Sequence, residues 1–261
     1  MTESSPSLDG RIIWNEIHYT DLAATAKFYG ELFGWTTRPE DRDTYVHFYL
    51  GGKTVAGAMP IEAGSPVPPH WAVYVGTDDF EGYMQRAEAA GGQALMPVLD
   101  LPGTGKICAI ADSEGAVLSP FAPTDTTLDG WITDGAPGTF CWVELLCDDP
   151  VKASEYYAKV VGWDLSKMDM GPGGIYTLVA PKGSPEGFAV GGIQPKQLGD
   201  PSPSCWLPYI SVADIEACTT MVTNLGGTVQ VPVTEIPGKG RFSIVTDPGG
   251  TTFAMYWSLP K

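Results

Sequence analysis

The octapeptide Trp14-Asn-Glu-Ile-His-Tyr-Thr-Asp21 has a counterpart 128 positions later, Trp142-Val-Glu-Leu-Leu-Cys-Asp-Asp149. Both stretches place apolar and β-branched residues before an Asp, which is typical of a strand that leads into a capped helix. A recurrence of this length indicates an internal repeat, and a repeat determines the architecture of the whole chain.

A second pair of matching stretches, which begin at Trp71 and Trp206, lies 135 positions apart. The separation is seven larger than that of the first pair, so the second copy carries seven extra residues. They fall between Trp163 and Gly192, and insertions of this kind normally lie in loops. We therefore predict two modules, 10–122 and 140–258, joined by a linker, 123–139, that is rich in Thr, Asp, Gly and Pro.

Within each module the hydrophobic pattern predicts a strand, a helix and three further strands, and then the same order again. For the first module the expected helices are Leu22–Phe33, capped by Asp21, and Phe80–Ala90. The expected strands are Ile12–Tyr19, Tyr45–Leu50, Val55–Met59, Trp71–Val75, Ile107–Ala111 and Ala116–Phe121. The fold class is α+β, with tandem βαβββ units that form cupped mixed sheets and carry their helices on the outer faces.

At this point the chain resembles the glyoxalase, bleomycin-resistance and extradiol-dioxygenase proteins, also called the vicinal oxygen chelate superfamily. Among these it is similar to two-module members labelled glyoxalase-like or hydroxylase. The residues that carry the resemblance are Asp21, Lys27-Phe-Tyr29, Leu32-Phe-Gly-Trp35, Asp78-Asp79, Gly91-Gly92 and Asp247-Pro-Gly-Gly250. The superfamily includes isomerases, lyases, dioxygenases and drug-binding proteins, so the resemblance implies the fold more firmly than the reaction.

The resemblance also implies where a divalent metal would be bound. The corresponding positions hold Trp14, Gly57, Ala72 and Ser119 in the first module and Trp142, Gly192, Leu207 and Ala254 in the second. Indole, methyl and isobutyl groups cannot coordinate such an ion. We therefore expect no metal at the usual position.

One alternative metal site is open in the first module. Glu16 and His18 lie two apart on one predicted strand and so share a face, and His47 follows on a neighbouring strand. Two imidazoles and a carboxylate form the ligand set of non-haem iron sites. The second module has no His and could not hold a matching set. The other interpretation is that these three are polar residues of the sheet surface.

Glu16 and Glu144 occupy equivalent positions, each two residues after a Trp. A carboxylate among aromatic side chains is partly desolvated and can act as a general base next to a carbonyl group. Both are therefore candidate catalytic residues. The structural alternative is that each holds its strand in place through hydrogen bonds.

Further residues are candidates for substrate binding. The segments Pro102–Lys106 and Pro237–Arg241 each end in a basic residue that could bind an anion, or could be a solvated turn residue. Trp14 and Trp142 could line a pocket for a flat molecule or fill it. The complete set of binding candidates is Trp14, His18, His47, Tyr74, Lys106, Trp142, Tyr209 and Arg241.

Composition excludes several classes of partner. The chain of 261 residues has 15 Lys and Arg against 31 Asp and Glu, a net charge of −16. Nucleic acids and anionic membranes require a basic face, so neither is an expected partner. The five cysteines form no CxxC pair, which favours reduced thiols in a cytoplasmic protein, and no secretory signal or membrane span is visible.

Three functions remain open. The first is an enzyme that acts on a small carbonyl or polycyclic metabolite without the usual metal. The second is a protein that sequesters a drug or metabolite between aromatic side chains. The third is a metal-dependent glyoxalase, hydroxylase or dioxygenase that uses Glu16, His18 and His47. The chain could act as a monomer or a homodimer.

Overall fold

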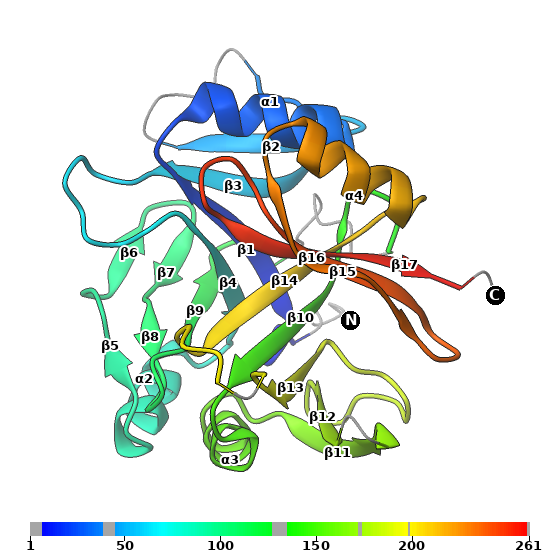
Figure 1. Ribbon diagram of the computed structural model, residues 1–261. Helices are drawn as coiled ribbons and strands as arrows, with labels where there is room; N and C mark the ends of the chain where they lie inside the picture. Colours follow the sequence, from blue (N-terminus) through cyan, green and yellow to red (C-terminus); the bar gives the residue numbers. More distant parts are fainter. Residues whose placement is uncertain (1–6, 39–44, 127–134, 172–173, 198, 260–261) are drawn as a thin grey trace, which may run out of the picture. The chain divides into compact units, whose positions relative to one another are not determined.

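The computed structural model describes residues 7–38, 45–126, 135–171, 174–197 and 199–259. It confirms the expected α+β fold, in which two curled mixed sheets are accompanied by helices (Figure 1). No helix among the described residues is long and apolar enough to cross a membrane.

The first module contains two helices and nine strands within its described residues. They are β1 (Ile12–Tyr19), α1 (Leu22–Phe33), β2 (Val46–Leu50), β3 (Lys53–Pro60), β4 (His70–Gly76), α2 (Phe80–Ala89), β5 (Gln93–Ala94), β6 (Leu99–Leu101), β7 (Gly105–Ile107), β8 (Ile110–Ala111) and β9 (Val117–Pro123). The expected β1 and α1 are confirmed at both ends. Asp21 caps α1 because its side chain accepts a hydrogen bond from the backbone N–H of Ala24, and Gly34 ends the helix in the left-handed conformation.

The second module follows a similar order. Its elements are β10 (Phe140–Cys147), α3 (Pro150–Val160), β11 (Asp164–Asp169), β12 (Ile175–Ala180), β13 (Gly191–Pro195), β14 (Cys205–Ser211), α4 (Ile215–Asn224), β15 (Thr228–Ile236), β16 (Gly240–Thr246) and β17 (Thr252–Ser258). Among the described residues it has one more strand, β11, between its first helix and the strand equivalent to β2. The first sheet has the strand order β2-β3-β1-β4-β9-β7-β6, and the second has the order β11-β12-β13-β10-β14-β17-β16-β15. The predicted linker lies in part outside the described residues, at 127–134.

One expected strand, Ile107–Ala111, is wrong in its extent, because the structure divides it into β7 and β8. The interruption lies at Cys108, opposite Pro120 of β9, whose backbone can accept a hydrogen bond but has no N–H to return one. The equivalent position of β17 is Met255, which has an N–H, and β16 is continuous there. A single proline therefore accounts for the difference between the two copies.

The chain divides into two compact units, and each unit draws on both modules. The first unit consists of Met1–Trp14, Val73–Asp129 and Val143–Trp206, and the second consists of Asn15–Ala72, Gly130–Trp142 and Leu207–Lys261. Helices α2 and α3 contact each other in the first unit, and α1 and α4 contact each other in the second (Figure 1). The module boundaries taken from the repeat remain a prediction.

The core of the second unit is organised around Tyr29 of α1. Its hydroxyl donates a hydrogen bond to the Asp247 carboxylate (3.1 Å) and accepts one from the Trp71 indole N–H (3.2 Å). The indole of Trp35 stacks on the Tyr29 ring and donates to the Gly138 carbonyl (2.8 Å). Burial and the neighbouring carboxylate raise the pKa of Tyr29 well above its ordinary value, so the phenol stays protonated and donates.

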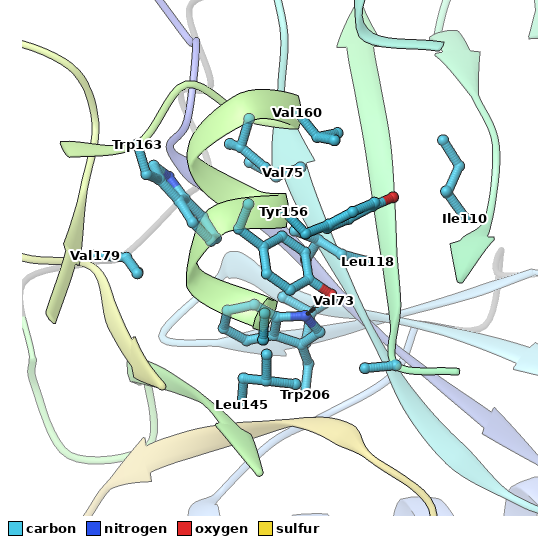
Figure 2. Close-up of a cluster of buried hydrophobic side chains, with 14 of the residues drawn as sticks. Val73, Val75, Ile110, Leu118, Leu145, Tyr156, Val160, Trp163, Val179 and Trp206 are labelled. Carbon is cyan, nitrogen blue, oxygen red and sulfur yellow. Dashed lines mark hydrogen bonds between the residues drawn. The ribbon is translucent and has the colours of Figure 1, made fainter. Parts of the chain in front are cut away.

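The first unit repeats this arrangement with the modules exchanged. Tyr157 of α3 donates to Asp112 (3.0 Å) and accepts from the Trp206 indole (2.9 Å), while Trp163 donates to the Gly10 carbonyl (2.7 Å). Figure 2 shows Trp163 and Trp206 beside α3, among the buried side chains of this core. In both units a tyrosine from the first helix of one module bonds to the last hairpin of the other.

A matched pair of substitutions tests the weight of this hydrogen bond. Tyr157→Phe leaves a buried carboxylate and indole N–H without their shared partner, so we expect a loss of about 1–3 kcal/mol in the free energy of unfolding. Tyr156 is its buried neighbour, and its hydroxyl has no hydrogen-bond partner among the described residues. Tyr156→Phe should therefore cost little or nothing in urea denaturation. Equal losses in the two variants would contradict this account.

Candidate functional site

The best-defined polar group on the first sheet is the pair Glu16 and His18 on β1. Alternation along β1 directs Ile17 and Tyr19 into the apolar core, and it directs Glu16 and His18 to the opposite face, as predicted. Glu16 is only 4% exposed, and its Oε1 lies 2.9 Å from His18 Nε2. An ionised carboxylate can only accept, so this nitrogen of His18 carries the proton.

His70 at the start of β4 completes this group. Its ring stacks on that of His18, with centroids 4.4 Å apart and planes 16° apart. Its Nδ1 lies 2.8 Å from the Pro68 carbonyl, which fixes the proton on that nitrogen. Burial lowers the pKa of His70, and the neighbouring His18 acts in the same direction. The His70 ring is therefore neutral at pH 7.

His47 lies on the same face, at the same level as Glu16. Glu16 pairs with Gly57 of β3, and Gly57 pairs with His47 of β2. Two strand spacings lie between Glu16 and His47, so their backbones are about 10 Å apart. Because the residue between them is a glycine, no side chain of β3 stands at this level. We call Glu16, His18, His47 and His70 the Glu16 face; all four belong to the second unit.

Glu144 occupies the equivalent place in the first unit but has different surroundings. The Tyr176 hydroxyl donates a hydrogen bond to Glu144 Oε1 (2.9 Å). The intervening residue is again a glycine, Gly192, but a Cβ there would overlap the Tyr176 ring, so that ring covers the glycine. The residue across from Gly192 is Leu178, where the first module has His47. The two glutamates thus share a sequence position but not an environment.

The aromatic candidates are distributed over both units. In the first unit Trp14 is half-buried, and the buried Tyr74 packs edge-on against Phe121, with centroids 6.3 Å apart. In the second unit Trp142 is half-buried, and the buried Tyr209 lies 6.4 Å from the Phe242 ring. Each set lies within its own unit, and we assign no shared pocket to them.

The two basic candidates bind carboxylates of the helices. Lys106 Nζ lies 2.6 Å from Glu81 Oε1 of α2, and Arg241 forms an ion pair with Glu216 of α4. Arg241 also lies over the Trp257 ring, 4.6 Å from its centroid. These contacts support the structural alternative for both residues, and their predicted role in binding an anion remains a prediction.

The residues present do not fit the divalent metal that the resemblance implies. Trp14, Ala72 and Ser119 provide no imidazole or carboxylate at those positions, and the Trp142 set provides none either. In the part of the chain that the structure describes, no three His, Cys, Asp or Glu side chains are grouped as ligands of a metal ion.

Sequence reasoning missed two members of these sites, His70 and Tyr176. His70 is one of three histidines in the chain and lies two residues before Ala72. Strand alternation would therefore have placed His70 on the same face as Ala72, one of the ligand positions that the resemblance implies. Tyr176 reaches Glu144 across Gly192, and no sequence pattern indicates that contact. A hydrogen bond between strands that are not neighbours requires the structure.

Comparison with known proteins supports a relationship over nearly the whole chain. Residues 11–119 and 139–255 match the Glyoxalase/Bleomycin resistance protein/Dioxygenase superfamily. The chain is 31% identical to CFP32 of Mycobacterium tuberculosis, named as a candidate glyoxylase, over all of both chains. It is 30% identical to the anthracycline biosynthesis protein DnrV of Streptomyces peucetius, over 98% of this chain and 94% of the relative.

Solved structures agree on the fold. The Mn(II)-bound glyoxalase of Novosphingobium aromaticivorans superimposes with a TM-score of 0.64 at 16% identity, over 98% of this chain and 84% of that chain. The 2,2',3-trihydroxybiphenyl 1,2-dioxygenase of Sphingomonas wittichii gives a TM-score of 0.64 at 14% identity, over 95% and 90% of the two chains. At these identities the likeness extends to the fold alone.

The surroundings of His70 lead to a pH prediction. The pKa of His70 is lower in the folded chain than its ordinary value of about 6.5. As the pH falls through about 6.5, the unfolded chain therefore binds a proton at His70 before the folded chain does. Protonation of His70 then lowers the free energy of unfolding. The chain has three histidines, which makes their imidazole C–H signals assignable in a proton NMR titration with single His→Gln variants. We expect the His70 signal to titrate below 6.5. A titration at or above 6.5 would contradict the packing described.

Proposed function

Because the chain belongs to the Glyoxalase/Bleomycin resistance protein/Dioxygenase superfamily, we propose that it is an enzyme that transforms a small carbonyl compound or a polycyclic metabolite at the Glu16 face. The names of its relatives support this range of substrates, since one refers to a glyoxylase and another to anthracycline biosynthesis. The observation that carries the proposal is the buried hydrogen bond between Glu16 and His18.

In the proposed mechanism Glu16 acts as the general base. Its carboxylate takes a proton from the carbon next to the substrate carbonyl, and His18 keeps the carboxylate oriented through its Nε2 proton. Negative charge then develops on the carbonyl oxygen, where a neutral or charged imidazole can donate a hydrogen bond. His47, across Gly57 from Glu16, is the group that we assign to this task.

Glu144 has a different role in this proposal. The Tyr176 hydroxyl donates a hydrogen bond to Glu144, and the Tyr176 ring covers Gly192. The space beside Glu144 on the second sheet is therefore filled by protein. We therefore assign Glu144 to holding the second sheet together rather than to catalysis. The assignment separates two residues that the repeat alone makes equivalent.

The proposal includes no divalent metal. The chemistry of the donor set supports this, because the family's ligand positions hold indole, methyl and hydroxyl groups in the first module. Glu16 and His18 are bonded to each other, which suits acid–base chemistry.

A second candidate is a protein that binds a metabolite without changing it. The ring centroids of Tyr45, just before β2, and of Tyr49, on β2, lie 5.1 and 6.2 Å from that of His47, and such a row of flat side chains suits a flat ligand. An enzyme and a binding protein differ in one observable, the formation of product.

The two glutamates provide a matched test. The chain is incubated in D2O with methylglyoxal, with and without glutathione, and with 1-tetralone, a fused-ring ketone that has C–H groups next to its carbonyl, and products and deuterium uptake are followed by mass spectrometry. We expect Glu16→Gln to lower turnover by about 10²–10⁴-fold, the usual contribution of a general base, while the fold is retained. Glu144→Gln should stay within a few-fold of the parent chain.

The outcomes separate the candidates. Unchanged turnover in Glu16→Gln would remove that residue from the mechanism. 1-Tetralone that binds, quenches Trp fluorescence and is recovered with no new mass and no deuterium would favour the binding protein.

Metal analysis tests the remaining part of the proposal. Protein purified without chelator and without a histidine tag should contain far less than one equivalent of iron, zinc, nickel or manganese, and added metal should not shift its melting temperature. A near-stoichiometric metal that is lost in His18→Gln and His47→Gln would instead support the metal site formed by Glu16, His18 and His47.

A further inference from the structure

The second module has a longer connection between β12 and β13 than the first module has between β2 and β3, and the proposed function does not use it. Residues 181–190 join β12 to β13, whereas 51–52 make the equivalent turn between β2 and β3 (Figure 1). By strand register, four of the seven extra residues lie in this connection, because Leu178 and Gly192 are 14 positions apart and the equivalent His47 and Gly57 are 10 apart. Loops that are lengthened in this way commonly carry function on a fixed scaffold.

This loop forms one wall of a cleft of about 620 Å³ in the first unit. The other wall is the beginning of the described chain. The lining residues are Ser7, Asp9, Arg11, Pro181, Lys182, Gly183, Ser184, Pro185 and Phe188. A volume of this size lies within the range of small-molecule sites.

Both walls are held by hydrogen bonds. The Trp163 indole donates to the Gly10 carbonyl (2.7 Å), and Gly10 approaches so closely that a Cβ would lie 2.9 Å from that indole. On the other wall the Gly183 N–H donates to Asp164 Oδ2 (2.9 Å), and the Ser184 hydroxyl donates to the Pro181 carbonyl (2.7 Å). The cleft is therefore preformed, which lowers the entropic cost of binding.

The charges in the cleft favour an anion. Arg11 and Lys182 form no ion pair within the described residues, although the chain as a whole carries a net charge of −16. The carboxylate of the cleft, Asp9, accepts a hydrogen bond from the Asp78 backbone N–H (2.7 Å). The cleft is thus lined by two cations, Arg11 and Lys182, and by one carboxylate, Asp9, which already accepts a hydrogen bond from the backbone.

Phe188 adds an apolar surface to these charges. Its side chain is 52% exposed, and among the described residues it is the one Phe, Tyr or Trp that is classed as exposed. We propose that this cleft binds a small anionic molecule that carries an aromatic ring. Arg11 and Lys182 bind its anionic group, and the ring lies against Phe188.

Isothermal titration with four probes tests the proposal. The probes are 1-naphthyl phosphate, 1-naphthoate, the neutral 1-naphthol and inorganic phosphate. We expect at least one aromatic anion to bind with a stoichiometry of one per chain, and 1-naphthol and inorganic phosphate to bind at least ten-fold more weakly. Comparison of 1-naphthyl phosphate with 1-naphthoate identifies the preferred anion, and rising salt should weaken binding.

Matched variants locate the site. The double variant Arg11→Gln/Lys182→Gln should bind the preferred probe about 10- to 100-fold more weakly, as expected for the loss of hydrogen bonds to a charged group. Phe188→Ala should also weaken binding. The control is Lys159→Gln/Lys167→Gln, which removes two exposed cations of the same unit that do not line the cleft and should bind like the parent chain.

The proposal is overturned if neither aromatic anion binds, if 1-naphthol binds as tightly as the anions, or if the cleft double variant binds like the parent chain. It is also overturned if the control double variant loses as much affinity as the cleft variant, because binding would then follow net charge. Glu16→Gln should leave this binding unchanged, which separates the cleft from the Glu16 face.

Discussion

A buried tyrosine hydroxyl that donates to an aspartate of the other module is the contact on which each compact unit depends. Tyr29 bonds to Asp247 in one unit, and Tyr157 bonds to Asp112 in the other. A buried carboxylate without its donor is costly, so the first helix of one module and the last hairpin of the other must come together. Neither module can complete these cores by itself. The duplication seen in the sequence is therefore a structural requirement rather than two independent domains in series.

The tyrosine–aspartate hydrogen bonds lie on the faces of the sheets that pack against helices. The opposite faces of the sheets do not carry these bonds, and there the two modules differ. The positions of His18, His47 and His70 correspond to Leu146, Leu178 and Cys205 in the second module, and Tyr176 bonds to the glutamate that the two copies share. The hairpin between β12 and β13 has also grown, although the strands on both sides keep the register of the first module. Each copy thus preserves the residues that pack helices and varies those that could meet a ligand.

Much of this could be predicted from local sequence. Asp21 and Gly34 mark the ends of α1, and alternation along β1 places Glu16 and His18 on one face, because both depend on residues close in the chain. The break between β7 and β8 was missed because it depends on Pro120, which lies on a different strand. The ion pairs of Lys106 and Arg241 with helix carboxylates were missed for the same reason. Contacts between distant segments decide whether a basic residue is available to a ligand, and no spacing rule contains that information.

The comparison of Glu16 with Glu144 shows why sequence position alone cannot assign a catalytic role. Both residues stand beside a glycine of the neighbouring strand, and that glycine leaves the same space in both sheets. In one sheet a tyrosine ring occupies the space and bonds to the glutamate; in the other the glutamate bonds to a histidine of its own strand. A carboxylate that accepts from a phenol across the sheet is part of the packing. In our proposal the carboxylate beside the imidazole pair is the one that takes a proton, and this difference in surroundings, rather than the repeat, distinguishes the two faces.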